Sequence, residues 1–291
     1  MIPSLIRFRT CLLLIMIGLT LLLSAGCLAP GQDEEKPAIL VAVTIPPQEE
    51  MVREIGDGRV DVIVLIPPGS DPHTYEPSPG LVARASGADL YLPLGSGLFP
   101  VEDVMAGRLR AMNPDLAVTA VSSGVEVLGS GDRPDPHIWL SLKNARIMAE
   151  NTRDALVAVD PDNEDMYRAN ADRYSARIDD LDKKISGDLF RNDPGMILVT
   201  HQAWGYFARD YGLSIVSIEQ DGKEPTARDL ERLITLARAE GVAVVFAEAQ
   251  ENRREAQAVA DEIGGRVEVI DPLAPGYLAN MERIATAFAG S

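Results

Sequence analysis

Three histidines are the residues of this sequence that point most directly to chemistry. Among its 291 residues the chain has only His73, His137 and His201 as histidines. Neutral imidazole is a preferred ligand of zinc and of neighbouring transition metals. His73 and His201 each follow an apolar run typical of a β-strand, 60–66 and 196–200, and ligands bind at such strand ends in open α/β sheets. We therefore predict that the three histidines together bind one transition-metal ion, with zinc favoured.

The local sequence around two of the histidines favours a preformed site. His73 and His137 both end the tripeptide Asp-Pro-His. Proline fixes the backbone φ just before each histidine, which stiffens the loop that presents the ring. A single histidine is more commonly an ordinary hydrogen-bonded residue of the core or surface. The metal interpretation depends on three observations that agree. The chain has no histidine besides these three, two of them share a motif, and each lies beside a predicted strand or in a turn.

Zinc in proteins has four ligands, and the composition limits what the fourth is. Cys11 and Cys27 are the two cysteines, and both lie in the N-terminal segment, so the ligand is a carboxylate or a water. Asp271 and Glu248 each follow an apolar run. We predict Asp271 as the fourth metal ligand, and Glu248 as a carboxylate that holds an imidazole ring or as the alternative ligand. A role as helix N-cap stays open for each.

The N-terminus has the features of a targeting segment. Two arginines precede the apolar stretch 11–23, which is shorter than the roughly 20 residues of a membrane-spanning helix. The sequence Leu-Ser-Ala-Gly-Cys, which ends at Cys27, resembles the lipobox of prokaryotic lipoproteins. It implies a signal peptide at 1–26, a lipid on Cys27 and a tether at 27–37. The alternative is an uncleaved anchor helix. Either way we expect an extracytoplasmic protein, anchored to the cytoplasmic membrane by its N-terminus.

The overall composition excludes one class of partner. The formal net charge is −17, and binding to nucleic acid depends on Lys and Arg contacts to phosphate. Hydrophobic residues make up 46% of the chain, which is ample for a packed core. With Cys27 lipidated and Cys11 removed, the mature protein has no disulfide, so burial must stabilise it. We expect a monomer that does not bind nucleic acid.

Alternating apolar and amphipathic segments predict an α/β fold with parallel sheets flanked by helices. In the first half we expect strands at 39–45, 60–66 and 90–93 and helices at 47–55 and 81–88. In the second half we expect strands at 196–200, 213–218, 242–247 and 266–270, and helices at 203–211, 226–240, 252–263 and 277–289.

A segment with almost no strand pattern, 142–189, lies between the two halves. Within 162–189 apolar and aromatic residues recur at a spacing close to 3.6, which predicts an amphipathic helix of some 26 residues, about 39 Å long. A helix of that length can reach from one small domain to another. We therefore expect an N-terminal lobe at 38–160, a linker helix at 161–190 and a C-terminal lobe at 191–291.

Several segments, taken in order, resemble a known family. They are the lipobox, PPGSDPHTYEPSP, DPHIWLS, VTHQAWGYFARDYGL, FAEAQ and IDPLA. Together they resemble the zinc- and manganese-binding solute-binding lipoproteins of ABC transporters, the cluster A-I family. The resemblance covers essentially the whole mature chain. It implies two α/β lobes bridged by a rigid helix, and a metal in the cleft between the lobes.

The resemblance also assigns ligands and partners. It implies that His73 and His137 are N-lobe ligands, and that His201 and Asp271 are C-lobe ligands. It implies a membrane permease and a cytoplasmic ATPase as partners. Manganese members of the family usually have Glu at the position of His201, so the histidine favours Zn²⁺, with Mn²⁺ as the alternative. Many zinc members have a His-rich loop where 125–133 is short and without histidine, which puts auxiliary metal capture in doubt.

Two other classes of function compete with metal capture. A zinc hydrolase needs a general base beside an open metal position, but the chain has no His-Glu-x-x-His pattern. An adhesin or structural lipoprotein is the other alternative, because some members of the family are described as adhesins. We therefore expect a binding protein rather than an enzyme.

Overall fold

The computed structural model describes residues 38–95, 97–130, 133–219 and 225–291. The predicted signal peptide, the tether and Cys27 lie outside these residues. Within the described residues, every helix is too short or too polar to cross a membrane. Ala38 to Ser291 form one compact unit, so the predicted limits of the two lobes stay predictions.

The first half of the chain forms a four-stranded parallel sheet in the order β2-β1-β3-β4. Its strands are β1 (Ile39–Val43), β2 (Val60–Val64), β3 (Leu90–Leu92) and β4 (Ala117–Val118). β1 and β3 are buried almost throughout, because helices cover both faces of a parallel sheet. The continuous apolar runs seen in the sequence follow from that double burial.

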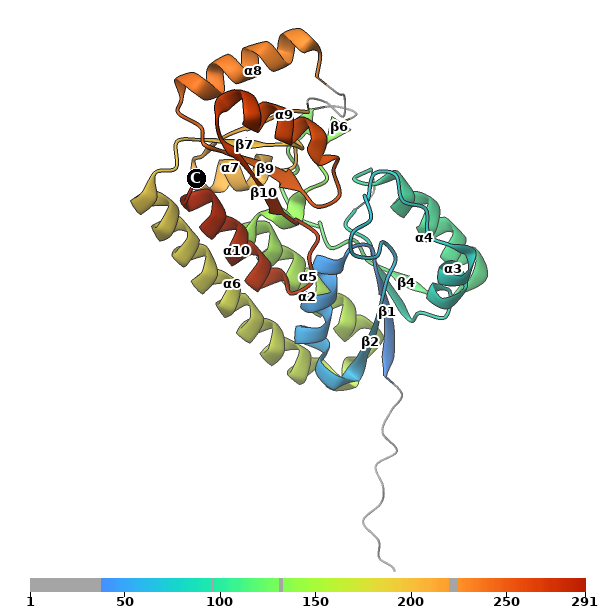
Figure 1. Ribbon diagram of the computed structural model, residues 1–291. Coiled ribbons are helices and arrows are strands. Elements are labelled where there is room, and N and C mark those ends of the chain that lie inside the picture. The colour runs from blue at the N-terminus through green and yellow to red at the C-terminus, as the bar shows by residue number, and fades with distance from the viewer. Residues whose placement is uncertain (1–37, 96, 131–132, 220–224) are drawn as a thin grey trace, which may run out of the picture. The chain divides into compact units, whose positions relative to one another are not determined.

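Two layers of helices flank this sheet (Figure 1). α3 (Pro79–Ala85) and α4 (Pro100–Met112) pack on its outer face, and α2 (Pro46–Gly56) and α5 (Leu142–Val159) pack on its inner face. Two short 3₁₀ helices, η1 (Asp57–Arg59) and η2 (Ile138–Leu140), lie in the connections. β5 (Gly129–Ser130) and β6 (Arg133–Pro134) form a small antiparallel pair.

The second half repeats the same strand order. β7 (Met196–Val199), β8 (Ser214–Ser217), β9 (Val244–Glu248) and β10 (Arg266–Ile270) form a parallel sheet in the order β10-β9-β7-β8. Read from the other edge, this is second, first, third, fourth, as in the first sheet. The flanking helices are α7 (Gly205–Tyr211), α8 (Ala227–Ala239), α9 (Arg253–Ile263) and α10 (Tyr277–Ala289).

Helix α6 (Glu164–Asn192) connects the two halves, after the 3₁₀ turn η3 (Pro161–Asn163). Its 29 residues give a length of about 44 Å, close to the 39 Å expected from the sequence. α6 packs against α2, α5 and α10, and Figure 1 shows it running along both halves. The predicted long helix is confirmed, and it has side-chain contacts along much of its length.

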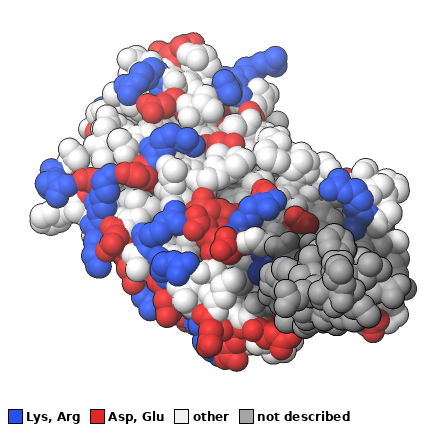
Figure 2. Space-filling view, turned by 90° about the horizontal axis from the view of Figure 1, so that it is seen from below, with Lys and Arg blue, Asp and Glu red and all other residues white. Residues whose placement is uncertain are grey.

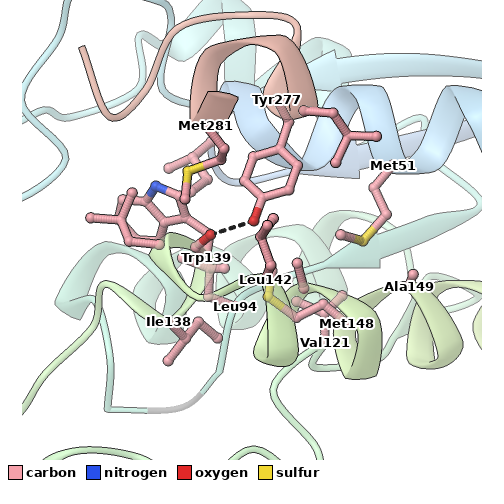
Figure 3. Packing of buried hydrophobic residues seen from close by; sticks show 14 of the residues in the cluster. Met51, Leu94, Val121, Ile138, Trp139, Leu142, Met148, Ala149, Tyr277 and Met281 are labelled. Carbon is pink, nitrogen blue, oxygen red and sulfur yellow. Dashed lines mark hydrogen bonds between the residues drawn. The ribbon is translucent and has the colours of Figure 1, made fainter. Parts of the chain in front are cut away.

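One hydrophobic core extends through both halves. Alternate residues of β1 and β7, such as Val41, Val43, Ile197 and Val199, belong to a single buried cluster that also includes α6 and α10. Figure 3 shows part of this core, where Tyr277 of α10 reaches the backbone of Trp139. Two smaller clusters fill the outer layers. Because the halves share their largest core, closely packed side chains oppose large movements between them.

The polar face of α6 is paired with its neighbours. Arg146 of α5 pairs with Asp179 at 2.6 Å, Arg177 pairs with Glu54 of α2 at 2.7 Å, and Lys184 pairs with Glu282 of α10. Figure 2 shows Lys and Arg interspersed with Asp and Glu on the face that it displays. Although the chain is acidic overall, charges of both signs alternate there.

Most expected elements are found within a few residues of their predicted limits. Helix α8 begins with a capping box, in which Thr226 is the N-cap and Asp229 the reciprocal partner. Helix α9 ends at Gly264, a left-handed C-cap with φ of 72°. Helix α4 was not predicted. The strand expected at 242–247 runs instead over Val244–Glu248, so Glu248 is the last residue of β9 rather than the residue after it.

Candidate metal centre

The three histidines lie together although they come from three distant loops. The ring centroids are 5.4 Å apart for His73 and His137, 5.3 Å for His73 and His201, and 5.1 Å for His137 and His201. One ring nitrogen from each lies within 4.8 Å of the others. The Nε2 atoms of His137 and His201 are 3.3 Å apart. The structure therefore brings together the three rings that the sequence singled out.

Local backbone geometry presents two of these rings. Asp71 accepts a hydrogen bond from the backbone N–H of His73 at 2.8 Å, and Asp135 accepts one from that of His137 at 3.0 Å. Each is a side-chain turn over two residues, a conformation that Asp favours. His201 follows β7, at the carboxyl end of the second sheet.

Carboxylates hold two of the rings on their outer side. The Nδ1 atom of His137 lies 2.7 Å from Oδ1 of Asp135, and that of His201 lies 2.9 Å from Oε2 of Glu219. Neither carboxylate was predicted as part of the site. The Asp-Pro-His motif contained a signal for Asp135. For Glu219 no local signal exists, because it reaches His201 from the end of the neighbouring strand.

Burial and neighbouring charges set the protonation of the rings. His137 is buried, and its pKa is lowered mainly by loss of water. The pKa of the more exposed His73 is lowered to about 4, first by desolvation and then by the other two histidines. Burial also lowers the pKa of His201, but Glu248 and Glu219 outweigh it, so the net pKa is raised. His73 and His137 are thus neutral near pH 7, the form that binds metals.

Asp271 directly precedes Pro272 and Leu273, which line the histidine cavity, and its own atoms have other partners. Its Oδ1 atom accepts hydrogen bonds from Nε2 of Gln250 at 2.7 Å and from the backbone N–H of Leu273 at 2.9 Å. Its backbone carbonyl accepts a hydrogen bond from Asn280 at 2.7 Å. The group of ligand atoms within 4.8 Å of one another contains the three histidines without Asp271. Its role as fourth ligand stays a prediction.

Glu248 faces the same site from the end of β9. It is buried, and its Oε1 atom accepts a hydrogen bond from the indole N–H of Trp204 at 2.9 Å. Burial raises the pKa of its carboxyl to about 7. Among the described residues, the ring that is hydrogen-bonded to the Glu248 carboxylate is thus an indole and not an imidazole. Asp135 and Glu219 are hydrogen-bonded to the rings of His137 and His201, and the role of Glu248 stays a prediction.

A small cavity of about 20 Å³ lies among these side chains, enough for one ion or one water molecule. Its walls are formed by the three histidines, two carboxylates of the C-terminal half and the residues next to them, namely Asp71, Pro72, His73, His137, Trp139, His201, Glu248, Gln250, Glu251, Pro272 and Leu273. Such a space suits a bare ion better than an organic substrate, since small-molecule pockets are typically some 300 Å³ or larger.

The fold and this site together define a class of protein. Two parallel four-stranded sheets joined by one long helix, with histidines at their facing loops, are the architecture of a metal-binding solute-binding protein of an ABC transporter, of the cluster A-I type. The family model "Zinc-uptake complex component A periplasmic" (ZnuA) matches residues 41–291. The chain belongs to this family, which supplies a solute-binding component of transport and not an enzyme.

Similar proteins include both zinc and manganese binders. The chain is 29% identical over 282 residues to "High-affinity zinc uptake system protein ZnuA" of Bacillus subtilis, covering 89% of this chain and 88% of that protein. It is 29% identical over 265 residues to "Manganese ABC transporter substrate-binding lipoprotein PsaA" of Streptococcus mitis, covering 86% and 85%. A crystal structure of ZnuA aligns with a TM-score of 0.83 at 36% identity, covering 87% of this chain and 99% of that one.

These comparisons also indicate where proteins of this family are found. Its members are extracytoplasmic or periplasmic, and relatives such as PsaA are named lipoproteins. Solute-binding components of this kind work with a permease and an ATPase. The zinc hydrolase reading is excluded by the family.

Proposed function

We propose that this protein captures Zn²⁺ outside the cytoplasmic membrane and delivers it to an ABC permease. The observation that carries the proposal is the convergence of all three histidines of the chain on one small cavity. Three imidazoles suit zinc, whereas manganese prefers oxygen ligands. Mn²⁺ is the second candidate, since carboxylates surround the rings and the manganese-named PsaA is 29% identical to this chain, as is the Bacillus subtilis zinc protein.

We further propose Asp271 as the fourth ligand. Its Oδ1 atom is used by Gln250 and Leu273, which would steady the carboxylate while Oδ2 reaches the ion. Glu248 is the alternative ligand. Lipid on Cys27 would keep the monomer at the membrane, near the permease and ATPase that take up the ion. Because α6 and the shared core oppose hinge bending, binding is expected to order loops near His201 and Asp271 more than to move the halves.

Calorimetry on the metal-free protein tests the proposal. Zinc is expected to bind one ion per chain and more tightly than manganese. His73→Ala and His137→Ala should lose high-affinity zinc binding but keep the fold, as judged by circular dichroism, while Gln257→Ala on the exposed face of α9 serves as control. Wild-type affinity in either histidine variant would disprove the site.

The fourth ligand is tested by a pair of matched variants. Asp271→Asn and Glu248→Gln each remove one negative charge with little change in size. If Asp271 binds the ion, Asp271→Asn weakens zinc binding more than Glu248→Gln does. The reverse order would assign the fourth position to Glu248.

A further inference from the structure

Two of the three histidine rings are held by carboxylates on the side that faces away from the cavity. Asp135 contacts Nδ1 of His137 at 2.7 Å, and Glu219 contacts Nδ1 of His201 at 2.9 Å. One carboxylate comes from the N-terminal half and the other from the C-terminal half. The Nε2 atoms of both rings point toward each other, 3.3 Å apart. The same arrangement is thus built twice, from unrelated local sequences.

An ionised carboxylate only accepts hydrogen bonds. A neutral imidazole beside it must therefore carry its proton on Nδ1, which leaves the lone pair on Nε2. The carboxylate also makes that lone pair more basic, and residues in this position affect metal affinity by about 10–100-fold. In both rings the atom left with a lone pair is the one that faces the other histidine.

The third histidine lacks such a partner among the described residues. Asp71 accepts from the backbone N–H of His73 with Oδ1, but its Oδ2 atom is taken by the hydroxyl of Thr74 at 2.8 Å. The residue after His137 is the apolar Ile138, which leaves Asp135 available for the ring. Packing also makes room for Asp135, because a Cβ on Gly205 would lie 3.0 Å from its Oδ2 atom. The Asp-Pro-His motif therefore places its Asp against the ring of His137 but not against the ring of His73.

We propose, resting on the metal-binding function above, that Asp135 and Glu219 are positioning residues that fix His137 and His201 as the two preset ligands and thereby favour zinc over manganese. His73, exposed and with no ring partner shown, completes the site when the ion arrives. The preference for zinc follows because a more basic imidazole nitrogen strengthens a bond that zinc favours more than manganese does.

Nuclear magnetic resonance of the metal-free protein tests the tautomers directly. The chain has only three histidines, so long-range ¹H–¹⁵N spectra of the rings contain three systems to assign. At about pH 9, where imidazoles are neutral, His137 and His201 are expected as the Nδ1–H tautomer and His73 as a mixture. Nε2–H tautomers at His137 or His201 in the wild-type protein would overturn the proposal without any variant.

Two matched variants separate hydrogen bonding from charge. Glu219 and Glu251 both lie within 4.8 Å of a His201 nitrogen, but only Glu219 is hydrogen-bonded to the ring among the described contacts. Glu219→Ala is expected to weaken zinc binding by about 10–100-fold, to weaken manganese binding less, and to mix the tautomers of His201. Glu251→Ala removes the same charge from the wall of the cavity, so it should lower the affinity for both metals, but it should leave the His201 tautomer and the zinc-to-manganese ratio as in the wild type.

The outcomes distinguish this proposal from the function on which it rests. If the wild-type protein binds neither zinc nor manganese, the proposed function fails. If it binds zinc but Glu219→Ala and Glu251→Ala behave alike, the function stands and the positioning role is wrong. Should Glu219→Ala fold poorly, Glu219→Gln keeps an acceptor without the charge, and equal zinc-to-manganese ratios in it and the wild type would also overturn the proposal.

Discussion

The two halves of the molecule have the same strand order but use the end of the sheet differently. In open α/β sheets of this kind, ligands bind where the strand order reverses, which is between β1 and β3 in the first half and between β7 and β9 in the second. A threonine directly follows the central strand in both, Thr44 after β1 and Thr200 after β7. What surrounds these threonines differs.

In the first half, the chain fills this position itself. The carboxyl of Glu102, from α4, accepts hydrogen bonds from the Thr44 hydroxyl and from the backbone N–H groups of Leu94 at 2.7 Å and Gly95 at 3.0 Å. Gln48 adds bonds to the backbone N–H groups of Thr44 and Ile45 at 3.0 and 3.1 Å. The backbone groups at this strand end are satisfied internally.

In the second half, the corresponding position borders the histidine cavity. The Thr200 hydroxyl accepts a hydrogen bond from the backbone N–H of Glu248 at 3.1 Å, and the Glu248 carboxyl faces the cavity beside His201. The first half therefore supplies its histidines from long loops, and the second supplies His201 from a strand end. The same strand order therefore gives a strand end that is closed by internal hydrogen bonds in the first half, and a strand end that borders the histidine cavity in the second half.

The largest expected effect is on stability. Glu102→Ala removes the acceptor of the buried N–H groups of Leu94 and Gly95 and one partner of the Thr44 hydroxyl, which should lower the free energy of unfolding by about 3 kcal/mol. Glu248→Ala removes one described partner, the Trp204 indole, and should cost about 1–2 kcal/mol while changing zinc binding. Urea denaturation of the metal-free variants measures both. Equal losses would contradict the contrast between the halves.

The second prediction concerns pH. Burial raises the pKa of Glu102 to about 7 from an ordinary value of 4.5, so the folded state holds this proton more tightly than the unfolded state does. Its contribution is complete below pH 4.5 and is lost as the pH rises through 7. Between pH 5 and 8 the unfolding free energy of the wild type should therefore fall by about 3 kcal/mol more than that of Glu102→Gln.

Comparison with Glu102→Gln cancels the histidines and other groups that titrate in the same range. Parallel pH profiles for the two proteins, measured by urea denaturation without metal, would show that Glu102 stays ionised in the folded state.

The smallest effect tests how firmly the halves are joined. The hydroxyl of Tyr277, in α10, donates to the backbone carbonyl of Trp139 at 2.6 Å, and the Trp139 indole donates to the carbonyl of Pro272 at 3.0 Å. Tyr277→Phe removes the first bond and should cost about 1 kcal/mol within a single cooperative unfolding transition. Two separate transitions in urea would show that the halves unfold independently.

Much of the fold is readable from the sequence because burial leaves local patterns. Continuous apolar runs predicted the buried strands, and the 3.6-residue spacing of apolar and aromatic residues predicted α6. Helix α4 has a weaker pattern, since Glu102 is buried on the side where an apolar residue is expected. Its carboxyl accepts hydrogen bonds from the backbone N–H groups of Leu94 and Gly95 and from the Thr44 hydroxyl, and the spacing of apolar residues in the helix does not indicate these contacts.

The candidate site shows the same division. Histidine is rare in this chain and sits in recognisable loops, so the three rings were predicted and the structure brings them together. The partner of His201 depends on which strand lies beside β7, and Glu219 was therefore missed. Strand order also determines that Gln250 reaches Asp271, a contact that no spacing in the sequence indicates.

The placement of the two tryptophans has a practical consequence. Trp139 and Trp204 are the only tryptophans of the chain. The Trp139 ring lies 5.4 Å from that of His137, and the Trp204 indole is hydrogen-bonded to Glu248. Any ion held by the histidines would change the surroundings of both indoles at once. Intrinsic fluorescence is therefore expected to report metal occupancy in the unlabelled protein, as a built-in optical signal.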